Sequence, residues 1–100
     1  MFGLIVRFEL RDVESARGFD RLVAETAPRI REDEPGTVIY AVHPVQDAPL
    51  SRVFYELYED REAFEAHEAQ PHTRRFLDER EQYLTETRVE FLGSPVGKGV

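Results

Sequence analysis

The segment FYELYEDREAFEAH, residues 54–67, largely decides how the rest of the chain folds. Side chains in its first half alternate, with Phe54 and Tyr58 on one side and Tyr55 and Leu57 on the other. A period of two is typical of a β-strand. The aspartate that follows is a preferred N-cap residue, so a helix can begin at once. The segment therefore predicts a strand that leads directly into a short helix.

The residues before this segment predict two more strands and one long helix. Alternating patterns indicate strands over 2–10 and 37–45, and Asp12 is placed to cap the helix between them. That helix carries an apolar stripe at helical spacing, made of Ala16, Phe19, Val23, Ala27 and Ile30. Pro28 lies within the stripe and predicts a kink or an irregular last turn. A turn at Glu34-Pro35-Gly36 should end the helix, and a loop over 46–49 should join strand 37–45 to strand 52–58.

The residues after this segment complete an α+β pattern. The short helix should run to about Glu68, and Gln70-Pro71 should start a third helix that reaches about Leu84. A last strand is expected over 88–92. The order β-α-β-β-α-α-β corresponds to the ferredoxin-like split βαβ fold, an antiparallel sheet with its helices on one face. We expect one domain over residues 1–92 and a C-terminal tail over 93–100.

Both faces of the predicted strands are apolar, although the helices can cover only one of them. In strand 52–58 the pair Phe54 and Tyr58 faces one way, and Tyr55 and Leu57 face the other. A chain of 100 residues has too few residues to cover the second face itself. We therefore expect a homodimer in which the two sheets pack face to face. The alternative is a small sheet that exposes a few aromatic side chains.

Charge and composition exclude several classes of function. The net charge of −7 does not favour binding to nucleic acids or to anionic membranes, both of which attract basic proteins. Without cysteine the chain can form no disulfide, thiolate metal site or cysteine nucleophile. No apolar run is long enough to span a bilayer, and no leader cleavage site follows the N-terminus. These features fit a cytoplasmic protein.

The chain resembles the antibiotic biosynthesis monooxygenase family from about Phe2 to Leu92. The resemblance is carried mainly by residues 54–67, together with Pro71-His72 and Phe76 downstream. Upstream, residues 34–37 and Tyr40 match the junction between helix and strand in that family. The resemblance implies a dimeric α+β barrel. For activity, it implies a monooxygenase that works without a cofactor on a small aromatic, phenolic or hydroquinone-type substrate.

One branch of this family degrades haem, and this sequence lacks the residues that the branch uses for that reaction. That branch uses an Asn, a Trp and a His, whereas this chain contains no Asn and no Trp. His67 falls where the branch has its Trp, and Leu77 falls where it has its haem ligand. Haem degradation of that kind is therefore not expected.

Two residues are the candidates for catalysis. His67 lies three residues after Phe64, so both can point towards the sheet, and an imidazole suits a base at neutral pH. A histidine that only packs and forms hydrogen bonds at a helix end is the alternative. Glu56 lies in a central strand, where it could orient His67 or pair with Arg52.

The candidate substrate-binding residues are Tyr40, Phe54, Tyr58, Phe64, His72 and Phe76. The aromatic side chains can equally be plain core, and His72 can be a structural residue in the first turn of its helix. His43 is interpreted as a loop residue, and the spacing of the three histidines does not suggest a metal site. The charged run at 74–75 and 78–81 is interpreted as a solvated helix face.

Two other functions remain open from the sequence. The same pocket and histidine could serve a non-oxidative enzyme, such as an isomerase or a degradative relative. The chain could also be a ligand-binding dimer without catalytic activity.

Overall fold

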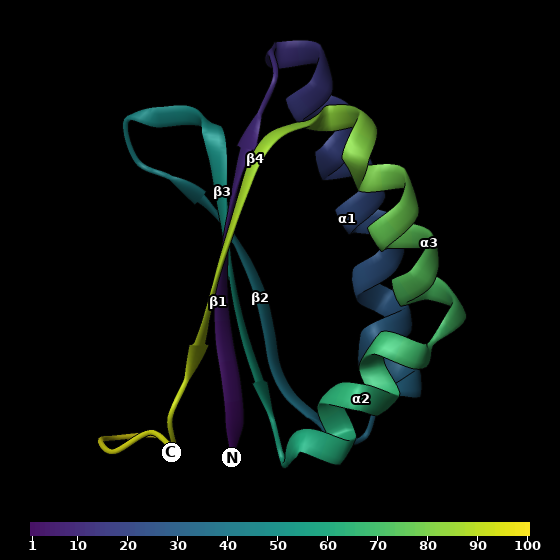
Figure 1. Cartoon of the computed structure of the whole chain (residues 1–100). Coiled ribbons are helices and arrows are strands. Elements are labelled where there is room, and N and C mark those ends of the chain that lie inside the picture. The colour runs from purple at the N-terminus through teal and green to yellow at the C-terminus, as the bar shows by residue number, and fades with distance from the viewer.

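A computed structural model describes residues 1–100 and shows one sheet with all helices on one face (Figure 1). The elements in chain order are β1 (Phe2–Leu10), α1 (Val13–Asp33), β2 (Thr37–Val45), β3 (Ala48–Tyr58), α2 (Arg61–Ala69), α3 (Pro71–Glu79), the 3₁₀-helix η1 (Arg80–Tyr83) and β4 (Leu84–Leu92). This order confirms the predicted ferredoxin-like α+β fold. None of the helices combines the length and apolar character needed to cross a bilayer.

The four strands pair antiparallel in the order β2-β3-β1-β4. The register places Leu4 of β1 beside Glu56 of β3 and Phe91 of β4, and Glu56 beside Tyr40 of β2. Side chains of these four residues therefore share the face that the helices cover. A polar residue at this central position is unusual and marks where the site begins.

Aromatic side chains fill the space between the sheet and α1. Phe8, Phe19, Phe54 and Tyr58 have the largest side chains that are fully buried. The rings of Phe8 and Phe54 meet edge to face with their centroids 4.9 Å apart, and Phe19 lies 5.3 Å from Phe8. Such edge-on contacts stabilise a core beyond the area that they bury. This cluster anchors one end of the helix layer.

Some predicted boundaries were wrong by several residues. β4 begins at Leu84, the expected end of the third helix, rather than at Arg88. The polar run from Thr85 to Arg88 has no apolar alternation because β4 is an edge strand exposed along most of its length. β3 begins at Ala48, since Pro49 lies beyond the residues that pair with β1 and loses no hydrogen bond there.

Pro28 does not end the long helix. α1 continues without interruption through Pro28 to Asp33, and Glu34 then caps it by donating its backbone N–H to the carbonyl of Ile30. A proline removes one backbone hydrogen bond, and the surrounding residues still hold the helix. The expected turn at Pro35-Gly36 follows immediately. The position of Glu34 at this junction is important for the site.

Candidate functional site

A cavity of about 300 Å³ lies between the sheet and the helices α2 and α3. Ten of its fifteen lining residues are hydrophobic. The strands contribute Leu4, Val6, Phe8, Tyr40, Phe54, Glu56, Val89 and Phe91, and the helical segments contribute Phe64, His67, Glu68, Thr73, Phe76, Leu77 and Arg80. A largely apolar cavity with a few polar groups is the usual form of a small-molecule site.

Most of the residues predicted for the site line this cavity. His67 and Glu56 do so, as do Tyr40, Phe54, Phe64 and Phe76. Tyr58 and His72 do not line it. Tyr58 is completely buried beside the cavity wall. His72 instead contacts the carboxylate of Glu34.

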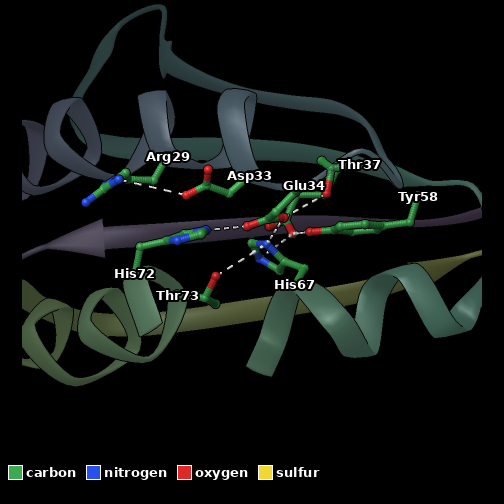
Figure 2. A network of polar contacts seen from close by, with 9 residues as sticks. Arg29, Asp33, Glu34, Thr37, Tyr58, His67, His72 and Thr73 are labelled. Carbon is green, nitrogen blue, oxygen red and sulfur yellow. Dashed lines mark hydrogen bonds and ion pairs between the residues drawn. The ribbon is translucent and has the colours of Figure 1, made fainter. Parts of the chain in front are cut away.

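His67 is held by a carboxylate that the sequence did not reveal. Its Nδ1 lies 2.7 Å from Oε1 of Glu34, and both side chains are about 5% exposed or less. Figure 2 shows the ring of His67 with Glu34 on one side and Thr73 nearby. A carboxylate only accepts hydrogen bonds, so Nδ1 carries a proton, and in the neutral form of the ring Nε2 keeps its lone pair.

Glu34 is the centre of a larger polar network. Its Oε1 also accepts a hydrogen bond of 2.8 Å from the hydroxyl of Thr37, and its Oε2 faces Nε2 of His72 at 2.5 Å (Figure 2). Both carboxylate oxygens are therefore occupied by donors. A buried carboxylate needs such partners to offset the cost of desolvation.

The sequence pattern around Glu34 predicts only a turn. One available signal was its place after the last turn of α1, where the helix dipole disfavours a negative charge. An acidic residue there needs compensation from elsewhere in the fold. The two histidines that provide it come from α2 and α3, which no local pattern connects with residue 34.

Glu56 faces His67 from the sheet without a hydrogen bond. Its Oε1 is 3.9 Å from Nε2 of His67 and accepts a hydrogen bond of 2.6 Å from the hydroxyl of Tyr58. Burial raises the pKa of Glu56, and the hydrogen bond from the Tyr58 hydroxyl opposes this rise in part. Arg52 does not pair with Glu56, because its guanidinium binds Asp20 of α1 at 2.9 Å. Orientation of the imidazole thus comes from Glu34 rather than from Glu56.

The two tyrosines beside the histidine keep their protons. Burial is the main factor that raises the pKa of Tyr40 well above its usual range, with the charges of Glu56 and Glu34 adding to it. The pKa of Tyr58 is raised in the same way, by burial first and then by Glu56. Both phenols are hydrogen-bond donors rather than bases, and both rings lie within 5.5 Å of the ring of His67.

The histidine and acidic side chains of the structure form no metal site. No group of three or more His, Asp and Glu side chains has the arrangement needed to hold an ion. His43 is exposed within β2 rather than in the hairpin loop. What the site offers is one imidazole nitrogen with a free lone pair, facing an apolar cavity.

Comparisons with known proteins agree with this architecture. The family model described as antibiotic biosynthesis monooxygenase matches residues 1–79. No curated protein gives a significant match to the sequence.

Several solved structures share the fold at low sequence identity. A crystal structure of an antibiotic biosynthesis monooxygenase has a TM-score of 0.85 at 23% identity, covering 96% of this chain and 100% of its own. A protein from Mycobacterium tuberculosis has a TM-score of 0.87 at 23% identity, with 99% and 98% covered. A protein from Pseudomonas aeruginosa has a TM-score of 0.84 at 21% identity, with 95% and 94% covered.

These structures support the fold, and the family model establishes family membership. The match spans β1 to the end of α3 and includes Glu34, Glu56, His67 and His72. The chain therefore belongs to the antibiotic biosynthesis monooxygenase family.

Proposed function

We propose that this protein is a cofactor-independent monooxygenase that oxidises a small aromatic substrate of the phenol or hydroquinone type. The observation that carries the proposal is the pair Glu34–His67, whose 2.7 Å contact leaves Nε2 free at the wall of an apolar cavity. Membership of the family supports the oxygenase chemistry. The arrangement of the side chains supports the role of His67 as the base.

The proposed reaction begins with proton transfer. Nε2 of His67 accepts the proton of a phenolic hydroxyl, and the carboxylate of Glu34 stabilises the imidazolium that forms. The resulting phenolate is electron-rich enough to transfer one electron to O₂. Superoxide and the phenoxyl radical then combine, which forms a C–O bond at a ring carbon.

The second half of the reaction closes the balance of atoms and electrons. The O–O bond breaks as the ring carbon loses its hydrogen, and His67 returns its proton to the departing oxygen. A phenol and one O₂ thus give a quinone and one water. The electron pair of that C–H bond forms the new carbonyl, and its proton joins the departing hydroxide to make water. The phenol thus loses four electrons and O₂ gains four, so no other reductant is needed.

The walls of the cavity suit this chemistry in two ways. Aromatic side chains such as Phe54, Phe64 and Phe76 can pack against a planar substrate. Their apolar surface also excludes water, which strengthens the interaction of charged groups inside. The protonated hydroxyl of Tyr40 can donate a hydrogen bond to the phenolate oxygen. A homodimer formed through the open sheet face is part of this proposal.

Oxygen uptake tests the proposal directly. Purified protein is mixed with naphthols and naphthohydroquinones in an oxygen electrode, and ¹⁸O₂ shows whether one labelled atom enters the quinone. His67→Gln should lower the rate by about a hundredfold or more, the scale expected for a lost general base. Glu65→Gln changes an exposed residue of the same helix, α2, and should keep the full rate.

Two results would contradict the proposal. One is oxygen uptake that is unchanged in His67→Gln while the variant remains folded. The other is conversion of a bound phenol in the wild type with no oxygen consumed, which would indicate a non-oxidative enzyme.

A further inference from the structure

Arg80 lies in the cavity rather than on the solvated helix face that its charged neighbours suggest. It begins η1 directly after α3, and its side chain is 21% exposed. Thr73, Phe76, Leu77 and Arg80 follow the spacing i, i+3, i+4 and i+7, which places them on one face of a helix. All four line the cavity.

The guanidinium of Arg80 has almost no partner within the protein. Its Nε is the one buried side-chain nitrogen or oxygen atom without a hydrogen bond. Its single ion pair is with Glu81, at 3.7 Å from Nε to Oε1, and Glu81 is itself 70% exposed. At that distance no hydrogen bond forms.

Aromatic rings hold the cation in place without satisfying its donors. The guanidinium carbon lies 5.2 Å from the ring centroid of Phe8 and 5.9 Å from that of Phe76. These cation–π contacts fix the position of the charge. They leave the N–H groups without acceptors, which is costly for a partly desolvated cation. The other polar groups of the site contrast with this, since His67 is paired with Glu34 and Glu56 with Tyr58.

We infer that Arg80 binds an anionic group of the ligand, and that the ligand is an aromatic molecule that carries a carboxylate. A guanidinium presents its donors in a planar fork that matches a carboxylate in two parallel hydrogen bonds. The rest of the cavity is mainly apolar, so the charge belongs at one end of an aromatic body. This inference rests on the proposed function, because it assigns the substrate class of the same cavity.

The strand register places the anionic end away from the proposed base. Arg80 lies over Phe8, whereas Glu56 pairs with Leu4, four residues earlier on β1. Four residues of a strand span about 13 Å. Val6 and Phe54 lie side by side between these two positions and line the same cavity. The ligand therefore lies along β1, with its carboxylate at Arg80 and its phenolic end towards His67.

A matched pair of probes tests the inference without any turnover. Calorimetry measures the binding of 2-naphthoate and of 2-naphthamide, which differ in charge and little in shape. The wild type should bind the naphthoate at least tenfold more tightly, the usual scale of a hydrogen-bonded ion pair. The net charge of −7 repels anions at long range, so such a preference must arise locally.

Three variants locate the preference. Arg80→Met keeps the long stem that packs on the two rings and should bind both probes equally, while Arg80→Lys should retain part of the preference. Arg75→Met is the control, because Arg75 is exposed on α3 and pairs with Glu25 and Glu79. In the wild type, the Nε–H signal of Arg80 should shift when naphthoate binds.

Equal binding of both probes by the wild type, binding of neither, or a preference that survives in Arg80→Met would overturn the inference. If Arg80→Met does not fold, the wild-type comparison and Arg80→Lys still decide. The proposed oxygenase function is judged separately by oxygen uptake. His67→Gln should keep the preference for naphthoate even though it loses turnover.

Discussion

The carboxylate of Glu34 connects two histidines that are otherwise unrelated in the sequence. It lies 2.7 Å from Nδ1 of His67 and 2.5 Å from Nε2 of His72, and it is buried at the unfavourable end of the α1 dipole. A carboxylate in this role sets the tautomer of an imidazole and stabilises its charged form. Glu34 is thus a positioning residue, and its effect should be visible in the rate rather than in substrate affinity.

Glu34→Gln tests this role. The amide has one acceptor oxygen and an NH₂ group that cannot accept, so at least one histidine loses its partner. The rate of oxygen uptake at saturating substrate should fall about 10- to 100-fold, the range for loss of such a supporting residue. KM should change little, because Glu34 does not line the cavity.

A fall in kcat/KM caused by KM alone would count against this assignment of Glu34. Glu32→Gln, a change of an exposed glutamate in the same turn of α1, is the matched control and should leave both parameters unchanged.

Glu56 should make stability depend on pH. Burial raises its pKa in the folded state, so the folded protein binds this proton more tightly than the unfolded chain. The stabilisation from the proton is present below the unfolded pKa of about 4.5 and is lost as the pH rises through the raised folded pKa. Glu56→Gln removes this loss and still accepts the hydrogen bond from Tyr58.

Thermal unfolding at several pH values measures the effect. Glu56→Gln should unfold at a higher temperature than the wild type at pH 8, and the difference should shrink towards pH 4. Glu65→Gln on the exposed side of α2 serves as the control and should follow the wild type at every pH. A variant that is less stable than the wild type at pH 8 would show that the ionised carboxylate is favourable here.

Among the helices and strands, hydrophobic periodicity predicts the elements that have one buried face and misses segments that are polar. The alternation in residues 2–10 and 54–58 reflects one buried face, and both strands formed as expected. The last strand is predicted from its apolar residues over 88–92, but the first part of β4 is missed because residues 85–88 are polar and carry no apolar alternation. Arg80 was assigned to the surface because a charged run was interpreted as one face, although its spacing from Phe76 places it inward.

The candidate site was predictable only as far as single elements extend. His67 and Glu56 could be named because strand β3 leads through one turn into α2. Glu34 could not, since its contact with His67 joins residues 33 positions apart in the chain. The sequence pattern of an element predicts which of its side chains are buried. Which side chain of another element each one contacts depends on how the elements pack.

α1 packs so closely against η1 that a methyl group added at their contact should destabilise the fold. A Cβ added to Gly18 would lie 2.4 Å from Cε1 of Tyr83. Helix propensity alone predicts that Gly18→Ala stabilises α1 by roughly 0.5–1 kcal/mol. The clash with the ring should reverse that sign and lower the free energy of unfolding by about 1–3 kcal/mol.

Chemical denaturation of the single and double variants separates the two effects. Gly18→Ala combined with Tyr83→Ala should be less destabilised than the sum of the two single variants, because the clash is absent. Additive effects would show that the ring and the new methyl group do not meet.

At the scale of the whole molecule, one face of the sheet has no helix over it (Figure 1). Ile5, Val53 and Tyr55 lie on this face and remain partly exposed, whereas the neighbouring Leu57 is buried. Arg7, Glu9 and Ser51 form a hydrogen-bonded polar group on the same face. An apolar patch with a polar margin is the usual composition of a protein interface.

We expect a homodimer through this face. At micromolar concentration, sedimentation should give about twice the mass of one chain. Tyr55→Arg should shift the protein to the monomer, because it places an unpaired charge in an apolar contact. Glu62→Arg introduces the same residue on the exposed side of α2 and should leave the dimer intact. A wild-type protein that sediments as a single chain would show that the sheet face is not an interface.

The protonation state of the His67 ring decides whether a base faces the cavity. Long-range ¹H–¹⁵N correlation spectra distinguish the two imidazole nitrogens, and His67→Gln identifies which signals belong to this residue. At a pH where the ring is neutral, we expect a proton on Nδ1, held by Glu34, and an unprotonated Nε2. A proton on Nε2 instead would leave no base facing the cavity and would contradict the proposed mechanism.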